Sequence, residues 1–298
     1  MKNEVQENMA KIRKLLHKSR KIVFLSGAGL SKESGIPTFR GQGGIWKNYD
    51  TSKLASFSAF TQNPSQVWEF YRYRQNMIAK CHPNAAHLSI SAMENQGVDV
   101  WVVTQNVDGL HNRAGSKKII ELHGNIFRAQ CIKCGYIGDV SVDIKGISNL
   151  DNDSEPNTNR RHVIPGNQKP SPSSTTTPSS PIFSTKCMES EKALPRCKNC
   201  KNVLKPGVVM FGEPLPKNEW LKATEVSSSC NMMVVVGTSL LVSPANTLPY
   251  YAKKNNAILV EVNLEKTWLS KMMDFTLIGT AAEILPKITA ICNDQNRQ

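Results

Sequence analysis

The stretch TQNVDGLHNRAGSKKIIELHG, residues Thr104–Gly124, follows one apolar segment and contains a second. The first, Val98–Val103, is apolar except for Asp99, which indicates a buried strand, and Asn106 and Asp108 come directly after it. In an open parallel sheet, ligands bind at the carboxyl ends of the strands. We therefore expect a functional site around these two side chains.

His123 closes the second apolar segment, Ile119–Leu122, and Gly124 follows it. The glycine lets the chain turn sharply, so we expect an exposed ring that can accept a proton near neutral pH. Taken alone, the same residues fit a simpler interpretation, in which Asn106 and Asp108 close turns and His123 caps a strand end.

The length and composition limit the class of protein. With 298 residues, the chain can form one large domain or a large and a small one. The apolar segments are strand-sized, below the roughly 20 residues that a helix needs to cross a bilayer, so we expect a soluble protein without a membrane partner. The first twenty residues lack the apolar core of a secretory signal.

The net charge of +13 is concentrated in part near the amino terminus, where residues 2–21 contain seven Lys or Arg and two Glu. Such an excess can bind nucleic acid, anionic lipid or a small anion. No aromatic residues alternate with these charges, as a base-stacking surface would require. A solvated helix face is therefore favoured, and nucleic acid is not an expected partner.

Apolar and amphipathic segments alternate along the chain. The periodicity predicts helices at Met9–Arg20, Phe57–Ala79, Ala85–Glu94, Asn218–Val226, Asn246–Lys254 and Ala281–Cys292. It predicts strands at Lys21–Leu25, Val98–Val103, Met232–Val236 and Ala257–Val262, with another near Phe275. Strands that alternate with helices predict an α/β protein with a parallel sheet.

Small residues follow two of these strands. Gly27-Ala28-Gly29 leads toward a helix at Leu30–Gly35, an arrangement that presents N–H groups to a pyrophosphate. Lys32 stands where a dinucleotide fingerprint has glycine, and a lone GxG is often only a turn. Gly237-Thr238-Ser239 also suits a phosphate or ribose. The glycine-rich loop that ends at Trp46 is expected to act as a lid.

Tyr71 and Arg74 are three positions apart and project from the same side of a helix. Together, a hydroxyl and a guanidinium can bind a carboxylate. The alternative is a surface arginine that packs on the tyrosine ring.

Two CxxC pairs, Cys131–Cys134 and Cys197–Cys200, match the spacing of a four-thiolate zinc site. Four sulfurs leave no open coordination position, so this zinc would be structural. The alternative is two unrelated thiol pairs, while a disulfide framework is not expected. Between the pairs, Ser148–Ser184 is rich in Asn, Ser, Thr and Pro, which predicts a disordered insertion.

Several blocks occur together and in order: GAGLSKESGIPTFRG, TQNVDGLHNRAG, ELHG, the two CxxC pairs, VVMFGEPLP, VGTSLLVSPAN and VEVN. From about Lys21 to Pro286 the chain resembles the sirtuins, NAD-dependent protein-lysine deacylases. This implies one catalytic region over 1–298, with a Rossmann-like large domain at about 10–50, 84–127 and 207–294. A small domain would combine a helical module at about 51–83 with a zinc module at about 128–206.

The resemblance also assigns roles to residues. It implies that His123 is the general base and that Asn106 and Asp108 act with it in catalysis. It implies NAD contacts at Gly27, Ala28, Gly29, Glu33, Pro37, Thr38, Phe39, Arg40, Trp46, Gln105, Asn106, Val107, Asp108, Gly237, Thr238, Ser239, Asn263, Leu264, Glu265 and Ala281. It implies substrate contacts at Tyr71, Arg74, Val209, Phe211, Gly212 and Glu213, and zinc ligation by Cys131, Cys134, Cys197 and Cys200.

The substrate would be an acylated lysine of a protein, added as a strand between Val209–Glu213 and Leu240–Ser243. The implied products are free lysine, nicotinamide and O-acyl-ADP-ribose. The context WEFYRYRQ resembles the class III branch, which removes succinyl, malonyl and glutaryl groups. Met210 and Thr51 depart from that branch. It implies a mitochondrial location, with cytosol and nucleus left open.

Three alternatives remain. A deacetylase of broad acyl range would keep the same machinery, and a protein ADP-ribosyltransferase would share the NAD site but use another nucleophile. A noncatalytic module that recruits chromatin or nucleic acid is disfavoured, because it has no need of Asn106, Asp108 and His123 together.

Overall fold

The computed structural model describes residues 2–39, 50–140 and 194–290, without the side chains of 2–4 and 51. Six parallel strands form its main sheet, in the order β3-β2-β1-β7-β8-β9. They are β1 (Lys21–Ser26), β2 (Asp99–Thr104), β3 (Ile119–Glu121), β7 (Met232–Val236), β8 (Ile258–Asn263) and β9 (Phe275–Ile278). The predicted α/β class with a parallel sheet is confirmed.

The strand order reverses at β1. Strands β2 and β3 lie on one side of β1, whereas β7, β8 and β9 lie on the other. This is the order of a Rossmann sheet, in which a crevice opens between the two central strands at their carboxyl ends. The two glycine-containing segments after β1 and β7 therefore meet at this crevice.

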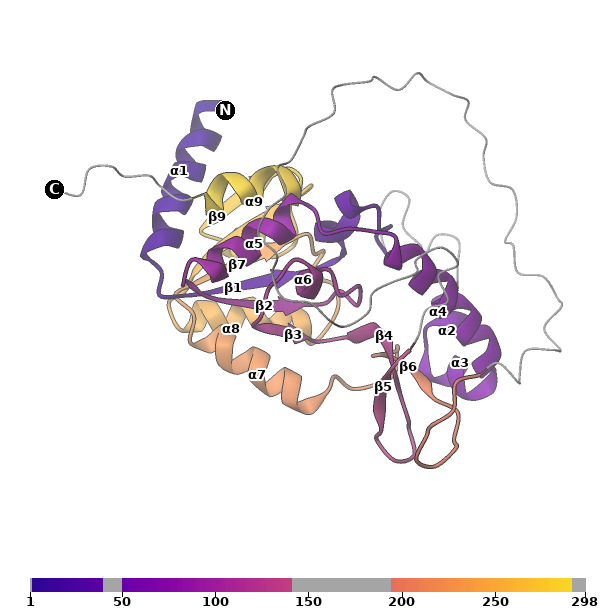
Figure 1. The fold of residues 1–298 in the computed structure, drawn as a ribbon. Coiled ribbons are helices and arrows are strands. Elements are labelled where there is room, and N and C mark those ends of the chain that lie inside the picture. The colour runs from indigo at the N-terminus through magenta and orange to yellow at the C-terminus, as the bar shows by residue number, and fades with distance from the viewer. Residues whose placement is uncertain (1, 40–49, 141–193, 291–298) are drawn as a thin grey trace, which may run out of the picture.

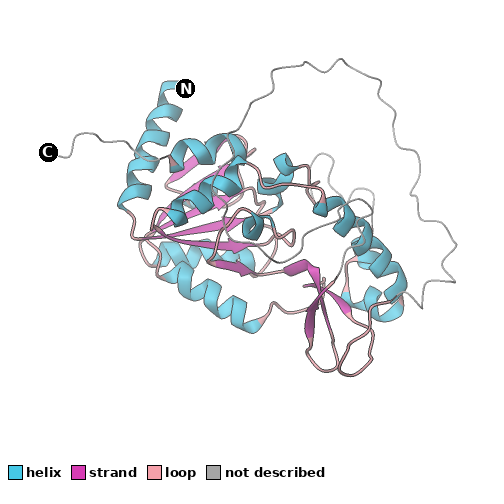
Figure 2. Ribbon diagram, viewed as in Figure 1, coloured by secondary structure: helices cyan, strands magenta, loops and turns pink. Residues whose placement is uncertain are grey.

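Helices cover both faces of the main sheet (Figures 1 and 2). One face carries α1 (Lys2–Lys18), α5 (Ala85–Asn95) and α9 (Ala281–Thr289), and the other carries α7 (Lys217–Ser228) and α8 (Leu248–Lys254). Successive strand residues point to opposite faces, so Phe24 belongs to the core under the first set, and Val23 and Leu25 to the core under the second. A sheet buried on both faces explains why these strands are almost continuously apolar.

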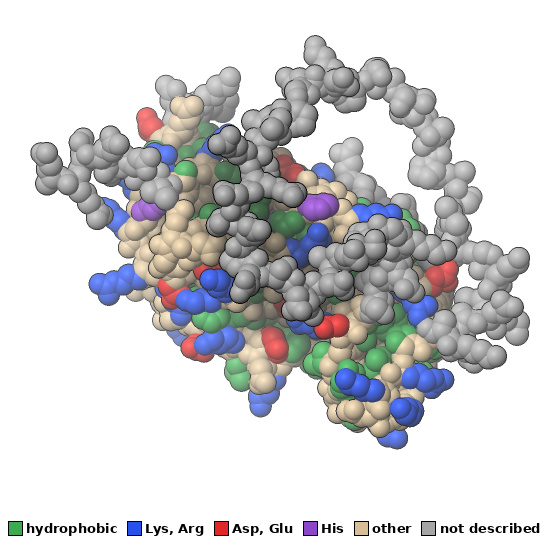
Figure 3. Space-filling model, viewed as in Figure 1, with side chains coloured by type: hydrophobic (Ala, Val, Ile, Leu, Met, Phe, Trp, Pro, Cys, Tyr) green, Lys and Arg blue, Asp and Glu red, His purple; other side chains and the backbone are tan. Residues whose placement is uncertain are grey.

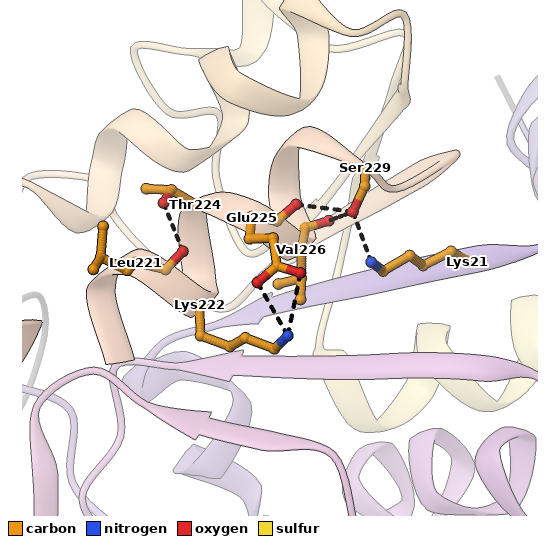
Figure 4. A network of polar contacts seen from close by, with 7 residues as sticks. All are labelled: Lys21, Leu221, Lys222, Thr224, Glu225, Val226 and Ser229. Atoms are coloured by element: carbon orange, nitrogen blue, oxygen red, sulfur yellow. Dashed lines mark hydrogen bonds and ion pairs between the residues drawn. The ribbon is translucent and has the colours of Figure 1, made fainter. Parts of the chain in front are cut away.

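Part of the basic excess is engaged on the protein's own surface, where α7 meets the amino end of β1 (Figure 4). Lys21 Nζ donates to Ser229 Oγ at 2.6 Å, and Lys222 Nζ lies 3.1 Å from a Glu225 carboxylate oxygen. Both ammonium groups also lie within 6 Å of the Trp101 ring centroid, at 5.9 and 5.2 Å. These lysines hold α7 on the sheet. Other Lys and Arg side chains gather at the end of the molecule below β5 and β6 (Figure 3).

A second, antiparallel sheet has the order β5-β4-β6. Its strands are β4 (Gly124–Gln130), β5 (Ile137–Asp139) and β6 (Lys205–Val208), and beside it lie α2 (Thr51–Leu54), α3 (Phe57–Gln62) and α4 (Pro64–Ala79) (Figure 1). Trp68 and Phe70 of α4 share a core with Ile126 and Val208 of this sheet. The remaining helices are η1 (Ala28–Ser34), α6 (Leu110–Arg113), η5 (Ala245–Thr247) and η6 (Ser270–Met272).

The prediction of one helix over Phe57–Ala79 is wrong, because the chain breaks at Asn63. This residue caps α4, its side chain accepting from Gln66 N at 3.1 Å, and Pro64 occupies the first turn. A residue before proline is disfavoured in helical geometry, and Asn63 has φ −143°. The helix expected at Leu30–Gly35 is the 3-10 helix η1, and η5 takes the first residues expected in the helix at Asn246–Lys254.

The other predicted helices and strands are confirmed, with ends that differ by a few residues, except that α1 begins at Lys2, seven residues before the predicted Met9. Arg40, Trp46, Cys292 and the insertion Ser148–Ser184 lie outside the described residues. In the part of the chain that is described, none of the helices combines the length and apolar composition that a bilayer crossing requires.

Candidate functional site

The segments after β1 and β7 touch through backbone atoms. Gly29 N donates to Gly237 O at 2.7 Å. A Cβ on Gly29 would lie 2.8 Å from Gly237 Cα, and one on Gly27 would lie 2.6 Å from Thr238 Cβ. Glycine is therefore required here for the two loops to pack, in addition to any contact with a phosphate.

A shallow depression, open to solvent, lies beside this contact. It brings together six of the predicted cofactor residues: Gly29, Glu33, Gly237, Asn263, Leu264 and Ala281. Asn263 Nδ2 donates to Thr238 O at 2.9 Å, and the carboxylate of Glu33 accepts from Ala282 N, at the start of α9, at 2.8 Å. Ser239 and Glu265 are exposed and do not line the depression, while Ala28, Pro37 and Thr38 are half-buried on the approach to it along η1 and its following loop.

Asn106 and Asp108 are each 5% exposed and are joined through Ser31. Asn106 Nδ2 donates to Gly27 O and to Ser31 Oγ, both at 3.1 Å, and Ser31 Oγ donates to Asp108 Oδ2 at 2.7 Å. Asp108 Oδ1 accepts from Leu110 N at 2.9 Å, with Val107 buried between the two polar residues. The two side chains are fixed in orientation, as a binding site for a planar amide requires.

Burial raises the pKa of Asp108, although the hydrogen bonds from Leu110 and Ser31 and the charge of Arg74 act in the opposite direction. Ser31 was missed by the sequence analysis. Its position two residues after Gly29, within the same block, is the signal that could have identified it.

His123 lies where the main sheet passes into the small one. Its Nδ1 lies 2.9 Å from Gln105 O, and because a carbonyl oxygen can only accept, Nδ1 carries the hydrogen. The neutral ring therefore offers Nε2 as an acceptor, the form that a general base needs. Gln105 Nε2 donates to Thr238 Oγ1 at 3.0 Å, which links this strand end to that of β7.

The ring of His123 is half-buried and not exposed as expected. Gly124 has φ +76°, but the chain does not turn away there and continues directly into the pairing of β4 with β6. The packing is so close that a Cβ on Gly124 would lie 2.2 Å from Gly207 O. Burial lowers the pKa of His123, against the hydrogen bond to Gln105, so the ring is neutral at pH 7.

Two histidines that the sequence analysis did not single out lie beneath the site. His87 and His111 are buried, with ring centroids 4.9 Å apart, and burial lowers their pKa values to about 2 and about 4. His111 Nε2 lies 3.0 Å from Ser26 Oγ, and His87 Nε2 lies 3.5 Å from Ser31 Oγ. They are neutral packing groups, of which His87 contacts Ser31 and His111 contacts Ser26 and the His87 ring.

Tyr71 and Arg74 of α4 are each 4% exposed, so the alternative of a surface arginine is wrong. The guanidinium carbon of Arg74 lies 4.8 Å from the centroid of the Phe39 ring. Within the described residues the guanidinium forms no ion pair, and its Nε has no hydrogen-bond partner. Burial lowers the pKa of Arg74 and raises that of Tyr71 to about 12, so the phenol stays protonated.

The predicted peptide segment Val209–Glu213 lies beside the base. Val209 N donates to His123 O at 2.8 Å, and Phe211 pairs with the backbone of Ala55 and Phe57, at 2.9 and 3.0 Å. These N–H groups are not available to an added strand, whereas Gly212 is exposed.

The four predicted zinc ligands converge at the end of the small sheet, with all sulfurs within 4.8 Å of one another. The Cys131–Cys200 and Cys134–Cys197 sulfur pairs are 3.4 and 3.5 Å apart. Tetrahedral zinc with Zn–S bonds of about 2.3 Å separates its sulfurs by about 3.8 Å, so one ion fits. The alternative of two unrelated thiol pairs is wrong, and four thiolate ligands make the zinc structural.

Comparison with known proteins extends this geometry. A profile of the Sir2 family matches residues 27–244. The NAD-dependent protein deacylase of Thermococcus kodakarensis is 38% identical over 92% of this chain and 92% of its own length.

Solved structures agree in fold. A Sir2 homologue in complex with NAD has a TM-score of 0.73 and 32% identity, over 94% of this chain and 92% of its own. A Sir2 protein with a deacetylated p53 peptide and 3′-O-acetyl ADP-ribose has a TM-score of 0.71 and 31% identity, over 94% of this chain and 96% of its own. Because both the profile and the relatives cover most of its length, the chain belongs to the Sir2 family of NAD-dependent protein deacylases.

Proposed function

We propose that this deacylase prefers acidic acyl groups, such as succinyl, malonyl and glutaryl, on the lysines of its protein substrates. The observation that carries the proposal is Arg74, a buried guanidinium without a carboxylate partner among the described residues. A buried charge is costly unless it is paired, and an arginine binds a carboxylate with two parallel hydrogen bonds.

The surroundings of Arg74 fit an acyl pocket. Asp108 is close enough for the two charges to influence each other's pKa, so Arg74 lies near the predicted nicotinamide residues. Tyr71, whose pKa is raised to about 12, supplies a neutral O–H donor on the same helix. An acyl carboxylate bound here would receive hydrogen bonds from both side chains.

The remaining chemistry rests on the residues around Asn106. When bound, NAD supplies the ribose carbon that accepts the acyl oxygen as nicotinamide leaves. The fixed amide of Asn106 and the carboxyl of Asp108 would hold the nicotinamide amide, and His123 Nε2 would take a proton from a ribose hydroxyl. The released acyl group would leave as O-acyl-ADP-ribose. A protein ADP-ribosyltransferase would use the same NAD residues, but it has no use for a buried arginine in an acyl pocket.

The test compares succinyl, malonyl, glutaryl and acetyl forms of one lysine peptide with NAD. We expect the wild-type enzyme to rank the acidic groups above acetyl. Arg74→Met should lower kcat/KM on the succinyl peptide by about tenfold or more, because a charge-assisted contact contributes about 1.5–3 kcal/mol, and should retain deacetylation.

Arg72→Met is the matched control, since Arg72 is exposed on the same helix and packs over Trp68. It should leave the ranking unchanged. Equal losses on both substrates in Arg74→Met would show that the residue is only structural, and a wild-type preference for acetyl would refute the acyl assignment.

A further inference from the structure

Lys205, the first residue of β6, is 3% exposed. Lysine is almost never buried to this extent unless it is paired. The sequence analysis gave this residue no role, and it is not a zinc ligand.

The Lys205 ammonium uses all three of its donors. It donates to Pro206 O at 3.2 Å, to Val208 O at 2.6 Å and to Glu213 Oε2 at 3.0 Å. Burial lowers the pKa of Lys205, and Glu213 opposes this effect. The ion pair is shielded from water, with 4% of the lysine side chain and 19% of the glutamate side chain exposed.

The same carboxylate oxygen closes a turn in the peptide segment Val209–Glu213. Glu213 Oε2 accepts from Met210 N at 2.8 Å, and Glu213 N donates to Met210 O at 3.0 Å. Gly212, inside this turn, has φ +90° and is exposed. Through its ion pair with Glu213, Lys205 thus stabilises the turn.

Backbone hydrogen bonds also anchor this segment, from Val209 to His123 and, inside the turn, between Phe211 and both Ala55 and Phe57. We infer that Lys205 is a positioning residue for substrate binding: through Glu213 it holds the Met210–Glu213 turn in the shape that a substrate peptide meets. This inference depends on the expected pairing of a substrate peptide with Val209–Glu213, in which Gly212 is exposed. Lys205 itself contacts neither the predicted NAD residues nor Arg74 in any recorded hydrogen bond or ion pair of the described chain.

The experiment measures the binding of a fluorescent succinyl-lysine peptide and of ADP-ribose to the full chain in separate titrations. Lys205→Met should weaken peptide binding about tenfold or more and leave ADP-ribose binding unchanged. Lys118→Met is the control, because it removes a lysine whose 2.7 Å ion pair with Asp99 is solvent-exposed, and it should change neither affinity.

Two further variants keep the test decisive if Lys205→Met folds poorly. Lys205→Met with Glu213→Leu removes both charges, which buried pairs often tolerate, and should fold yet still bind peptide weakly. Glu213→Gln keeps an acceptor for both donors and should retain most of the affinity. Hydrogen exchange at the Met210 amide should accelerate in the double variant and stay slow in Glu213→Gln.

The outcomes separate the hypotheses. Wild-type peptide affinity in the double variant, or an equal loss of ADP-ribose binding, would overturn the positioning role. If the wild-type chain did not bind the succinyl peptide but bound the acetyl form, the acyl preference would fail while the Lys205 comparison could be made on the acetyl peptide. If neither peptide bound, the peptide site at Val209–Glu213 would be refuted, and the role of Lys205 with it.

Discussion

At His123, the surroundings determine both the tautomer of the ring and its protonation state. The hydrogen bond from Nδ1 to Gln105 O fixes which nitrogen can accept a proton, and the partial burial of the ring keeps it neutral. The bond also holds the ring against the end of β2, beside Asn106. A base with a lowered pKa is weaker, but it is fully available at neutral pH.

The pH profile of kcat/KM tests this assignment. The neutral ring is the active form, so activity rises with pH through the pKa of His123 and is level above it. Because burial lowers that pKa from its ordinary value of 6.5, the acid limb should have its midpoint below pH 6.5. Activity should be measured between about pH 5 and 8, with circular dichroism at each pH to confirm that the protein stays folded.

His123→Ala provides the control and should form no O-acyl-ADP-ribose at any pH. A wild-type midpoint above pH 6.5 would contradict the assignment of the buried, neutral ring as the base.

At the level of elements, α4 is fastened to the small sheet on both sides of Tyr71 and Arg74, the proposed acyl-binding residues. Trp68 Nε1 donates to Leu204 O at 2.7 Å, and Gln75 Nε2 donates to Ile126 O at 2.5 Å. Trp68 precedes Tyr71 by one turn, and Gln75 follows Arg74 directly. The proposed acyl pocket therefore depends on the contact between α4 and the sheet that carries the cysteines.

Trp68→Phe should destabilise the protein by about 1–3 kcal/mol, because an aromatic ring, although a smaller one, is kept while the buried Leu204 carbonyl loses its donor. Urea unfolding measures this change. Trp268→Phe is the matched control, since Trp268 Nε1 also donates to a backbone carbonyl, Leu240 O at 2.9 Å, but the side chain is 53% exposed and water can replace it. Equal costs in the two variants would contradict the dependence on burial.

The same elements show how far the sequence alone could lead. Apolar strands and helical periodicity were sufficient to predict the main sheet, because a sheet covered on both faces leaves a strong pattern. The Asn63-Pro64 dipeptide could have indicated a break in the helix. The apolar residues on either side of it favoured the prediction of one continuous helix. The pairing of β4 with β6 was not predicted, since no local pattern shows that Gly124 meets Gly207 across about 80 residues of chain.

At the scale of the whole molecule, the sequence could name candidate residues for the site, but it could predict their arrangement only in part. Asn106, Asp108 and His123 were recognisable because they follow strands at one edge of a parallel sheet. Their connection through Ser31, the buried histidines below and the closure of the peptide segment by Lys205 depend on contacts between distant segments. Such contacts leave no periodic signal in a single sequence.

The zinc site joins the turn between β4 and β5 to the segment that precedes β6, so its removal should affect the small sheet first. We expect about one zinc per chain by metal analysis. Chelation should lower the melting temperature and abolish deacylation, because α4 and the peptide segment both pack on this sheet. ADP-ribose binding at the main sheet should be affected less.

Cys134→Ser should reproduce the effect of the chelator, whereas Cys230→Ser, at a buried cysteine outside the cluster, should retain the metal. A metal-free protein with unchanged melting temperature and activity would contradict the structural role of zinc.

The contact between Gly29 and Gly237 limits how this enzyme can evolve. Each of the two residues meets main-chain atoms of the other. A smaller side chain at a neighbouring position would therefore not make room for a methyl group on either glycine. Second-site suppressors of Gly29→Ala should therefore be rare in a genetic selection. Variation between related enzymes is expected to accumulate around these two positions and not at them.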